Sequence, residues 1–322
     1  MSHRNRVMKI SLAVSTALIA LTCIGQAGPI QQNQIAADAR WVAHLDVDRF
    51  LRTQLGEHIA REFVDKQLAK PTAKLKTDLG VEVDWRKIHS VTAYGWNFKG
   101  KEAADAVLVV QTDMDIPATL DSVIAKLESQ LGKELPLQKS EEQEGTVYQV
   151  KNEAYGAASK SGVFVITRTK ERLLTALKVM SGKADSLASS KLVGPLSEDR
   201  EAFLLFGVAE GFTEVANLPK QAQMLNQAAG ARLAAGEKAE SVFVTLSLDT
   251  RTVEAAAQMQ QLVQGLIALG NLNGEQNADL QKLAQNARVE AKEKQVTLAL
   301  QLPVQDVITK VNQANKGRKK GE

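Results

Sequence analysis

Hydrophobic and polar positions alternate along several short segments of the chain, and each alternation predicts a strand. From Trp41 to Val47 every second side chain is apolar, which is typical of a half-buried strand. In this interpretation His44 and Asp46 belong to the solvent-facing side. Further strands are predicted at 88–98, 104–112, 146–150, 154–159, 163–167, 202–209, 241–248, 288–291 and 295–302. Because these segments alternate instead of being apolar throughout, mostly antiparallel sheets are favoured.

Apolar residues spaced three and four positions apart predict helices between these strands. The first helix should begin after Asp48, whose short side chain can accept the free amides of the first turn, and Pro71 should end it. Asp113 or Asp115 is expected to cap the second helix, and Thr169 the third. The remaining helices are predicted at about 219–234, 253–270 and 279–286 and from residue 303 onward.

The order of these elements predicts an α+β fold in which mostly antiparallel sheets pack against helices. The 322 residues exceed the roughly 100–200 of a typical domain. A strand, then Asp or Pro, then a helix recurs at LDVDRF, TDMDIPATL, SLDTRTVE and LPVQDVI. We therefore expect an internal duplication of a β-α-β(β)-α-β-β unit. The expected parts are a linker at 28–39, a first α+β unit at 40–181, a connecting segment at 182–200, a second α+β unit at 201–314 and a basic, disordered tail at 315–322.

Residues 1–27 have the pattern of a secretory signal peptide. Arg4, Arg6 and Lys9 precede an apolar run of residues 10–24, and small residues stand at the positions that a cut after Ala27 requires. The run is shorter than the roughly 20 residues of a membrane-spanning helix, although retention as an anchor is an alternative to cleavage. We expect cleavage and export to the periplasm or to the outside of the cell.

Charge and cysteine content change once this segment is removed. The chain carries 40 Lys and Arg against 37 Asp and Glu, and the three basic residues of the leader account for the whole excess. The single cysteine also lies in the leader, so a disulfide framework, a cysteine nucleophile and a multi-cysteine metal site are excluded from the mature chain. A neutral body argues against binding of nucleic acid. No other segment reaches membrane-spanning length, so no span is expected after cleavage.

Local signatures of the common enzyme classes are absent from the sequence. It contains no G-x-x-x-x-G-K-[ST] loop, no G-x-G-x-x-G, no G-x-S-x-G and no H-E-x-x-H. Many active sites have no local signature, so these absences favour a protein that is not an enzyme without excluding one. No cofactor is expected.

The most specific candidate site is formed by His44, Asp46 and Asp48. A spacing of two residues places these side chains on one face of a strand, with neighbours about 7 Å apart. One imidazole and two carboxylates could bind a divalent metal ion or perform acid–base chemistry. The structural interpretation, which we favour, is the wet face of a half-exposed strand that ends in the Asp48 helix cap.

Two apolar features also have more than one interpretation. Tyr94, Trp96 and Phe98 share one strand face and could form a platform for a sugar or peptide, although core packing is the more common role of such rings. The helical stretch from Met259 to Leu269 has a broad apolar face. Burial against a sheet is favoured, and a partner groove, a membrane surface or a cavity for an apolar ligand are the alternatives.

Several segments resemble a family of secreted or periplasmic bacterial proteins of unknown function. They are ADARWVAHLDVDRF, VMSGKAD, AAAQMQQLVQGLIAL and VTLALQLPVQDV, and the resemblance covers nearly all of residues 37–311. In that family the mature region opens with a WVxHLDVD-type strand. The resemblance implies export and a duplicated α+β architecture, and it assigns no catalytic residue.

Together these features predict an exported, non-enzymatic binding or scaffold module of the envelope or the extracellular space. Its partner would be an envelope protein, a polysaccharide or a small apolar ligand. The alternatives are a metal-dependent, hydrolase-type enzyme that uses His44, Asp46 and Asp48, and a carrier of an apolar ligand.

Overall fold

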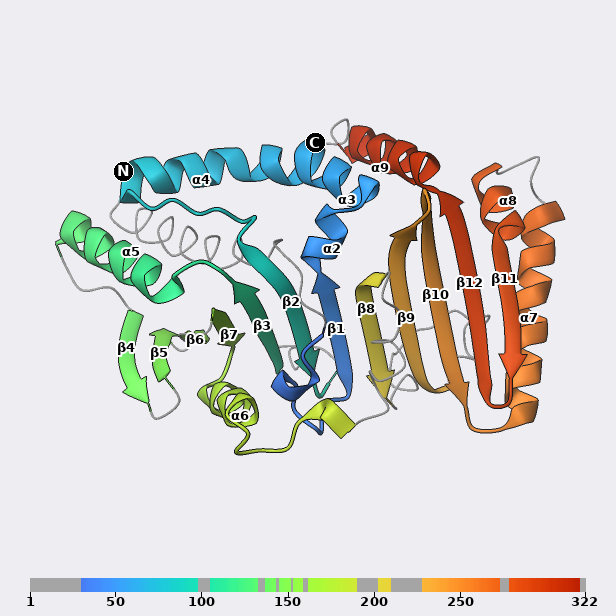
Figure 1. Cartoon of the computed structure of the whole chain (residues 1–322), viewed down its shortest axis with the longest axis horizontal. Helices are drawn as coiled ribbons and strands as arrows, with labels where there is room; N and C mark the ends of the chain where they lie inside the picture. Colours follow the sequence, from blue (N-terminus) through green and yellow to red (C-terminus); the bar gives the residue numbers. More distant parts are fainter. Residues whose placement is uncertain are drawn as a thin grey trace.

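The fold is taken from a computed structural model of the chain, which describes residues 30–97, 105–132, 137–142, 145–151, 153–158, 162–189, 202–209, 228–272 and 278–318. Among these residues, every named strand joins one antiparallel sheet (Figure 1). The strands are β1 (Trp41–Asp46), β2 (Ile88–Gly95), β3 (Ala106–Thr112), β4 (Leu137–Glu142), β5 (Gly145–Val150), β6 (Ala154–Ala158), β7 (Val163–Thr167), β8 (Ala202–Ala209), β9 (Ala228–Lys238), β10 (Ser241–Thr250), β11 (Ala287–Lys292) and β12 (Gln295–Pro303).

The helices connect these strands and confirm the expected α+β class. They are α2 (Val47–Leu51), α3 (Gln54–Ile59), α4 (Asp65–Leu79), α5 (Ile116–Leu131), α6 (Lys170–Met180), α7 (Val253–Leu272), α8 (Ala278–Gln285) and α9 (Val304–Arg318), with short turns η1 (Gln32–Gln34), η2 (Ala60–Val64) and η4 (Leu187–Ser189). Where several sheets were expected, the described strands form a single continuous one.

Strand order places the start of each half of the chain at the centre of the sheet. The order is β11-β12-β10-β9-β8-β1-β2-β3-β7-β6-β5-β4. β1 pairs with β8 in antiparallel register, with Trp41 opposite Val208 and Leu45 opposite Leu204. β1 also pairs with β2 on its other side. The central strand is therefore enclosed by neighbours along both edges.

Both faces of the sheet are packed in the first half. On one face, α6 buries Leu173 and Leu177 against residues of β1, β2 and β3, among them Val42 and Val107. On the other face, α5 packs through Ile116 against the cluster around Val110 and Phe164. Strand side chains alternate between faces, so Val107 and Val110 belong to opposite layers. The first half is thus a helix–sheet–helix arrangement.

The second half packs α7 against one face of the sheet and further helices at one end of the strands. α7 lies beside β11 (Figure 1), and its Ala256 and Met259 are buried against Ala231, Leu248 and Val296. At the end of the central strands, α2, α3 and α9 share a cluster that contains Phe50, Leu55 and Val304. This cluster closes one end of the sheet core.

Two local expectations were wrong, each because tertiary packing outweighed a local signal. Pro71 lies inside α4 and does not end the helix, which stops at Gly80 in the left-handed region with φ 64°. The alanine-rich segment Ala228–Lys238, expected to be helical up to Ala234, forms β9 between β8 and β10. Alanine favours helices, but pairing with strands on both sides and burial of Ala231, Ala234 and Ala235 outweigh this preference.

The segment expected to be a polar linker is part of the core. Ile35, Ala36 and Ala39 are buried, and the backbone of Ile35 accepts a hydrogen bond from Leu187 N–H at 2.8 Å. Leu187 belongs to the expected connecting segment and is itself 1% exposed. Ordered structure therefore begins before Arg40, because these few apolar residues cover the sheet beside α6.

Candidate functional site

The end of β1 differs from the expectation for His44, Asp46 and Asp48. β1 ends at Asp46, whose Oδ1 accepts a hydrogen bond from Arg49 N–H at 2.8 Å and so caps α2. Asp46, and not Asp48, is therefore the N-cap, and Asp48 lies in the first turn of the helix. The spacing of two residues on one strand face stops at Asp46, because the chain turns into a helix there.

The prediction that His44 and Asp46 face solvent was wrong. They are 2% and 5% exposed, because β1 is a central strand of a sheet packed on this face. His44 Nδ1 lies 2.9 Å from Thr92 Oγ1 on the neighbouring strand. Burial raises the pKa of Asp46, and the hydrogen bond from Arg49 opposes this rise. Over the described residues, no three His, Cys, Asp or Glu side chains are placed to hold a metal ion.

The aromatic side chains of β2 pack in the core and do not form a platform. Tyr94 and Trp96 are 0% and 9% exposed, and their ring centroids lie 5.7 Å apart in an edge-to-face contact. The guanidinium of Arg172 in α6 lies 3.7 Å from the Trp96 ring centroid, and it forms a bidentate ion pair with Asp105. The core interpretation is confirmed for these two rings, and Phe98 lies outside the described residues.

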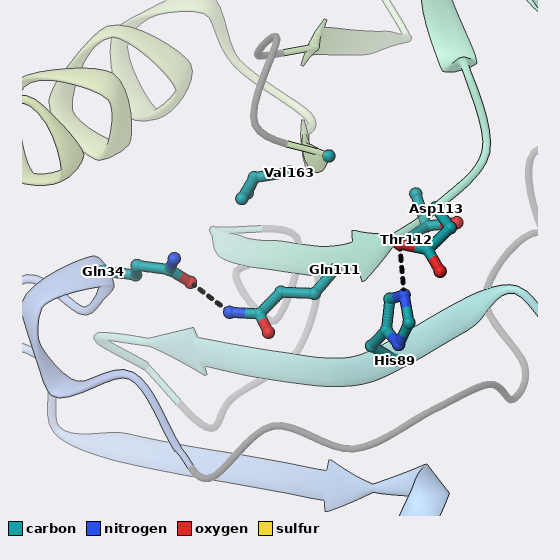
Figure 2. Close-up of a pocket in the computed structure, with 7 residues that line it drawn as sticks. Gln34, His89, Gln111, Thr112, Asp113 and Val163 are labelled. Atoms are coloured by element: carbon teal, nitrogen blue, oxygen red, sulfur yellow. Dashed lines mark hydrogen bonds and ion pairs between the residues drawn. The ribbon is translucent and has the colours of Figure 1, made fainter.

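A small hollow lies beside the first residues of β2 and the last residues of β3. In β2 the register shifts between Ile88 and Ser90, so His89 is an extra residue in a β-bulge. Its imidazole Nε2 lies 2.7 Å from Oδ1 of Asp113, the first residue after β3. Figure 2 shows this pair on one side of the hollow. A bulge is a common way to redirect a side chain, and here it turns His89 toward Asp113.

The opposite side of the hollow is formed by two carboxamides. Gln111 Nε2 donates a hydrogen bond to Oε1 of Gln34 at 3.3 Å, which joins β3 to η1 (Figure 2). The hollow is open to solvent on one side, and its volume is about 300 Å³. We call this cavity the His89 hollow; its lining residues are Gln34, His89, Gln111, Thr112, Asp113, Gly162 and Val163.

Gly162 holds the loop before β7 against the hollow. Its φ of +75° lies in the left-handed region, and a Cβ there would come 2.4 Å from the carbonyl oxygen of Thr112. Its own carbonyl accepts a hydrogen bond from Thr112 N–H at 2.8 Å. Only glycine allows this close approach without strain.

The groups in the His89 hollow are suited to binding more than to nucleophilic catalysis. Thr112 is 3% exposed, and its hydroxyl donates to Lys87 O at 2.8 Å and accepts from Met114 N–H at 3.0 Å. His89 and Asp113 resemble part of a catalytic triad, but this hydroxyl is committed to the backbone and does not supply the nucleophile. What remains are hydrogen-bond donors and acceptors in fixed positions.

Sequence reasoning missed this hollow because its parts come from three separate predicted elements. Gln34 lay in the expected linker, His89 at the start of a strand, and Asp113 was one of two candidate helix caps. Asp115 is the cap, since its Oδ1 accepts from Ala118 N–H at 3.0 Å. The only local signal in the sequence was Asp113, because one aspartate, Asp115, is enough to cap α5.

The second distinctive surface is formed by half-exposed leucines of α7 and α8. Among the 20 residues of α7 the single charged residue is Glu254. Its buried side contacts the sheet through Ala256 and Met259, while leucines of both helices stay about half exposed. We call these leucines the α7–α8 face; they are Leu266 (49% exposed), Leu269 (55%), Leu280 (44%) and Leu283 (41%).

The two helices approach each other closely at Gly270. A Cβ at this position would lie 2.9 Å from Cβ of Ala284 and 3.6 Å from Cγ of Leu280. The charged residues of α8 are engaged by α9, with Asp279 paired to Lys310 and Lys282 to Asp306, both at 2.6 Å. Within the described ranges, no helix is long and apolar enough to cross a membrane.

Comparison with known proteins gives few relatives. No family model and no curated protein matches the chain. Among solved structures, crystal form I of TP0453 is similar with a TM-score of 0.49 and 10% identity, covering 88% of this chain and 96% of that chain. Crystal forms IV and III of TP0453 have TM-scores of 0.42, with 10% and 8% identity, and cover 88% of this chain and 97% of that chain.

Proposed function

We propose that the protein is an exported, non-enzymatic binding or scaffold module that docks onto an apolar surface of an envelope protein through the α7–α8 face. The observation that carries this proposal is the cluster of half-exposed leucines on two adjoining helices. Export is supported by the basic, apolar and small-residue pattern of residues 1–27. The likeness of residues 37–311 to a family of secreted bacterial proteins supports the same location.

The chemistry of the face favours an apolar protein partner. Large apolar side chains that gather on a folded surface commonly mark an interaction site. The centre of a protein interface is depleted in charged residues, and α7 matches that rule because Glu254 is its single charged residue. In α8 the two charged residues, Asp279 and Lys282, are directed to ion pairs with α9. An uncharged face is complementary to an uncharged apolar partner, whereas a charged surface would lose hydration without gaining ion pairs.

Two alternative functions have less support. A metal-dependent hydrolase built on His44, Asp46 and Asp48 would need accessible side chains, and the first two are buried in the sheet. A carrier would need apolar side chains around an internal space between helix and sheet. Met259 is 1% exposed and packed against strand residues, and Leu266 and Leu269 are about half exposed to solvent.

Substitution of the half-exposed Leu266 and Leu269 tests the proposal. Tagged mature protein, the double variant Leu266→Gln/Leu269→Gln and the control Val253→Gln are used to capture partners from envelope extracts. Val253 is an equally exposed apolar residue of α7, 52% exposed, that lies outside the α7–α8 face. Returning about half of a leucine to water costs roughly 1 kcal/mol, so the double change is expected to weaken capture about tenfold or more.

Three outcomes are distinguished in this experiment. Loss of one specific partner in the double variant, with retention in Val253→Gln, supports the proposal. Equal capture by all three proteins contradicts it. Self-association that the double substitution abolishes, measured by light scattering, would assign the face to a second copy of the chain and would also overturn the envelope-partner proposal.

We also infer that the chain arose by duplication of the expected β-α-β(β)-α-β-β unit. Supporting this, the sheet runs outward as β1-β2-β3-β7-β6 on one side of the central pair and as β8-β9-β10-β12-β11 on the other. A helix follows the third strand of each series, namely α5 after β3 and α7 after β10. Another helix follows the fourth strand of each series, namely α6 after β7 and α9 after β12. The hairpin β4–β5 would be an addition to the first unit. Superposition of the two units by a two-fold rotation tests this inference, and a mismatch of helix faces would contradict it.

A further inference from the structure

We propose that the His89 hollow is a binding site for a neutral, polyhydroxylated ligand, namely a single sugar unit. The hollow lies between η1, β2, β3 and the start of β7, on the far side of the central pair from α7 and α8 (Figures 1 and 2). The inference therefore does not depend on the docking function of the α7–α8 face.

Size limits the ligand to one small molecule. The volume of about 300 Å³ is at the lower end of the range of roughly 300–1,000 Å³ for ligand pockets. The lining surface is polar and apolar in nearly equal parts, with Val163 as an apolar side chain beside the two carboxamides (Figure 2). A compact, hydroxyl-rich ring suits such a space better than a large apolar ligand.

The hydrogen-bonding groups match hydroxyls, which both donate and accept. The Gln111–Gln34 bond uses one amide donor and one amide acceptor. Each carboxamide retains the complementary group, so Oε1 of Gln111 can accept and the NH₂ of Gln34 can donate. Across the hollow, Asp113 keeps a second carboxylate oxygen, and its side chain is 73% exposed. Two neighbouring hydroxyls of a sugar ring can bridge such an alternation of donors and acceptors.

Charge in the hollow argues against ionic ligands. Among the described residues that line the hollow, Asp113 is the only acidic one, and its carboxylate is already bound to the imidazole of His89 at 2.7 Å. A divalent cation would find too few anionic ligands, consistent with the lack of a three-residue metal cluster among the described residues. An anion would meet the Asp113 carboxylate, and none of the lining residues that the structure describes is a lysine or an arginine. A neutral ligand avoids both costs.

The site is held on rigid elements before any ligand arrives. Asp113 N–H donates to Lys87 O at 2.8 Å, and Thr112 Oγ1 donates to the same carbonyl at 2.8 Å. These bonds fix the end of β3 against the bulge that carries His89. Polar groups supported in this way lose little freedom on binding.

Sugar binding can be measured by NMR titration of the mature full-length chain. The probes are glucose, galactose, mannose, N-acetylglucosamine and N-acetylmuramic acid methyl ester, with sodium phosphate and calcium chloride as ionic probes. The imidazole resonances provide a built-in control, because the mature chain has His44, His58 and His89 only. We expect at least one sugar to shift His89 and to leave buried His44 unchanged.

Variants separate a built site from unspecific contact. Gln111→Leu and Asp113→Ala each remove hydrogen-bonding groups and are expected to weaken sugar binding about three- to tenfold. Gln138→Leu, at an exposed position of β4, serves as the matched control and should bind as wild type. Asp113 is mostly exposed, so this variant keeps the test valid if Gln111→Leu fails to fold.

The proposal is overturned if no sugar of the panel shifts His89, or if both hollow variants bind as tightly as wild type. Binding of phosphate or calcium in place of the sugars would likewise contradict it. Retention of sugar binding by Leu266→Gln/Leu269→Gln is expected, because the two surfaces are separate.

Discussion

At the scale of single residues, buried polar groups in this protein organise the backbone. Asp46 is nearly inaccessible, yet its carboxylate accepts the Arg49 amide at 2.8 Å and has the Arg49 guanidinium at 3.5 Å. Burial disfavours the charged form more than these partners favour it, so the pKa of Asp46 is raised. The sequence pattern predicts Asp46 as part of a solvent-facing strand surface or, alternatively, as a metal ligand. In the structure it is a buried helix cap whose charged form is disfavoured by burial.

The burial of the Asp46 carboxylate predicts a pH-dependent effect of Asp46→Asn on stability. A carboxyl group with a pKa above its ordinary value of 3.8 binds protons more tightly in the folded state, so its contribution to stability falls as pH rises from that value through the raised pKa. The wild-type advantage over Asp46→Asn, in the free energy of unfolding by urea, should therefore decrease from pH 3.5 to pH 7. An advantage that grows over this range would show that the carboxylate is stabilising.

The matched variant Asp46→Ala removes the cap as well as the charge. We expect it to be about 1 kcal/mol less stable than Asp46→Asn at every pH, since asparagine retains the accepting oxygen. Equal stability of the two variants would mean that the hydrogen bond to Arg49 N–H contributes nothing.

Gly162 allows a second prediction at this scale. Gly162→Ala should lower the free energy of unfolding by about 1–3 kcal/mol more than Gly182→Ala, as measured by urea denaturation. Both glycines have a left-handed φ, +75° and +72°, but a Cβ at Gly182 would meet nothing within 4 Å, whereas at Gly162 it would meet Thr112 O. Similar losses in both variants would mean that the loop moves freely away from β3.

At the scale of elements, the sequence predicted those strands and helices whose patterns match their surroundings. β8 at 202–209 and β7 at 163–167 lie where expected, and Thr169 caps α6 as predicted. β4 was missed because an exposed edge strand has no apolar face to reveal it. The segment of β9 was predicted to be helical up to Ala234, because helix propensity is a local property and does not include pairing with β8 and β10. The His89 hollow needed a bulge register that no local pattern encodes.

The attachment of α6 to the sheet gives a prediction for one element. Arg172 in α6 forms a bidentate ion pair with Asp105 and stacks on Trp96. Arg172→Ala should lower the free energy of unfolding by about 2 kcal/mol, because the contacts with Asp105 and Trp96 are partly buried. It should also change the fluorescence of Trp96, which loses the guanidinium above its ring. Arg168→Ala, at an exposed position before the same helix, is the control and should change stability by less than about 0.5 kcal/mol. Equal effects would contradict the anchoring role of Arg172.

At the scale of the whole molecule, two unlike surfaces lie in the two halves of one continuous sheet, on either side of the central β1–β8 pair. The β1–β8 pair joins the halves of the chain, so the His89 hollow and the α7–α8 face belong to one rigid framework of antiparallel strands. The hollow is small and partly polar, and the α7–α8 face is formed by half-exposed leucines. Such a separation suits a module that is held at one partner while presenting another site, which is the scaffold role proposed above.

Photo-crosslinking in intact cells tests the central claim, docking through the α7–α8 face, most directly. A photoreactive phenylalanine analogue is placed at Leu269 or, as control, at Val253, both about half exposed on α7. The account predicts an adduct of one defined mass from position 269 that is absent from position 253 and contains an envelope protein. No adduct from 269, or the same set of adducts from both positions, would contradict it.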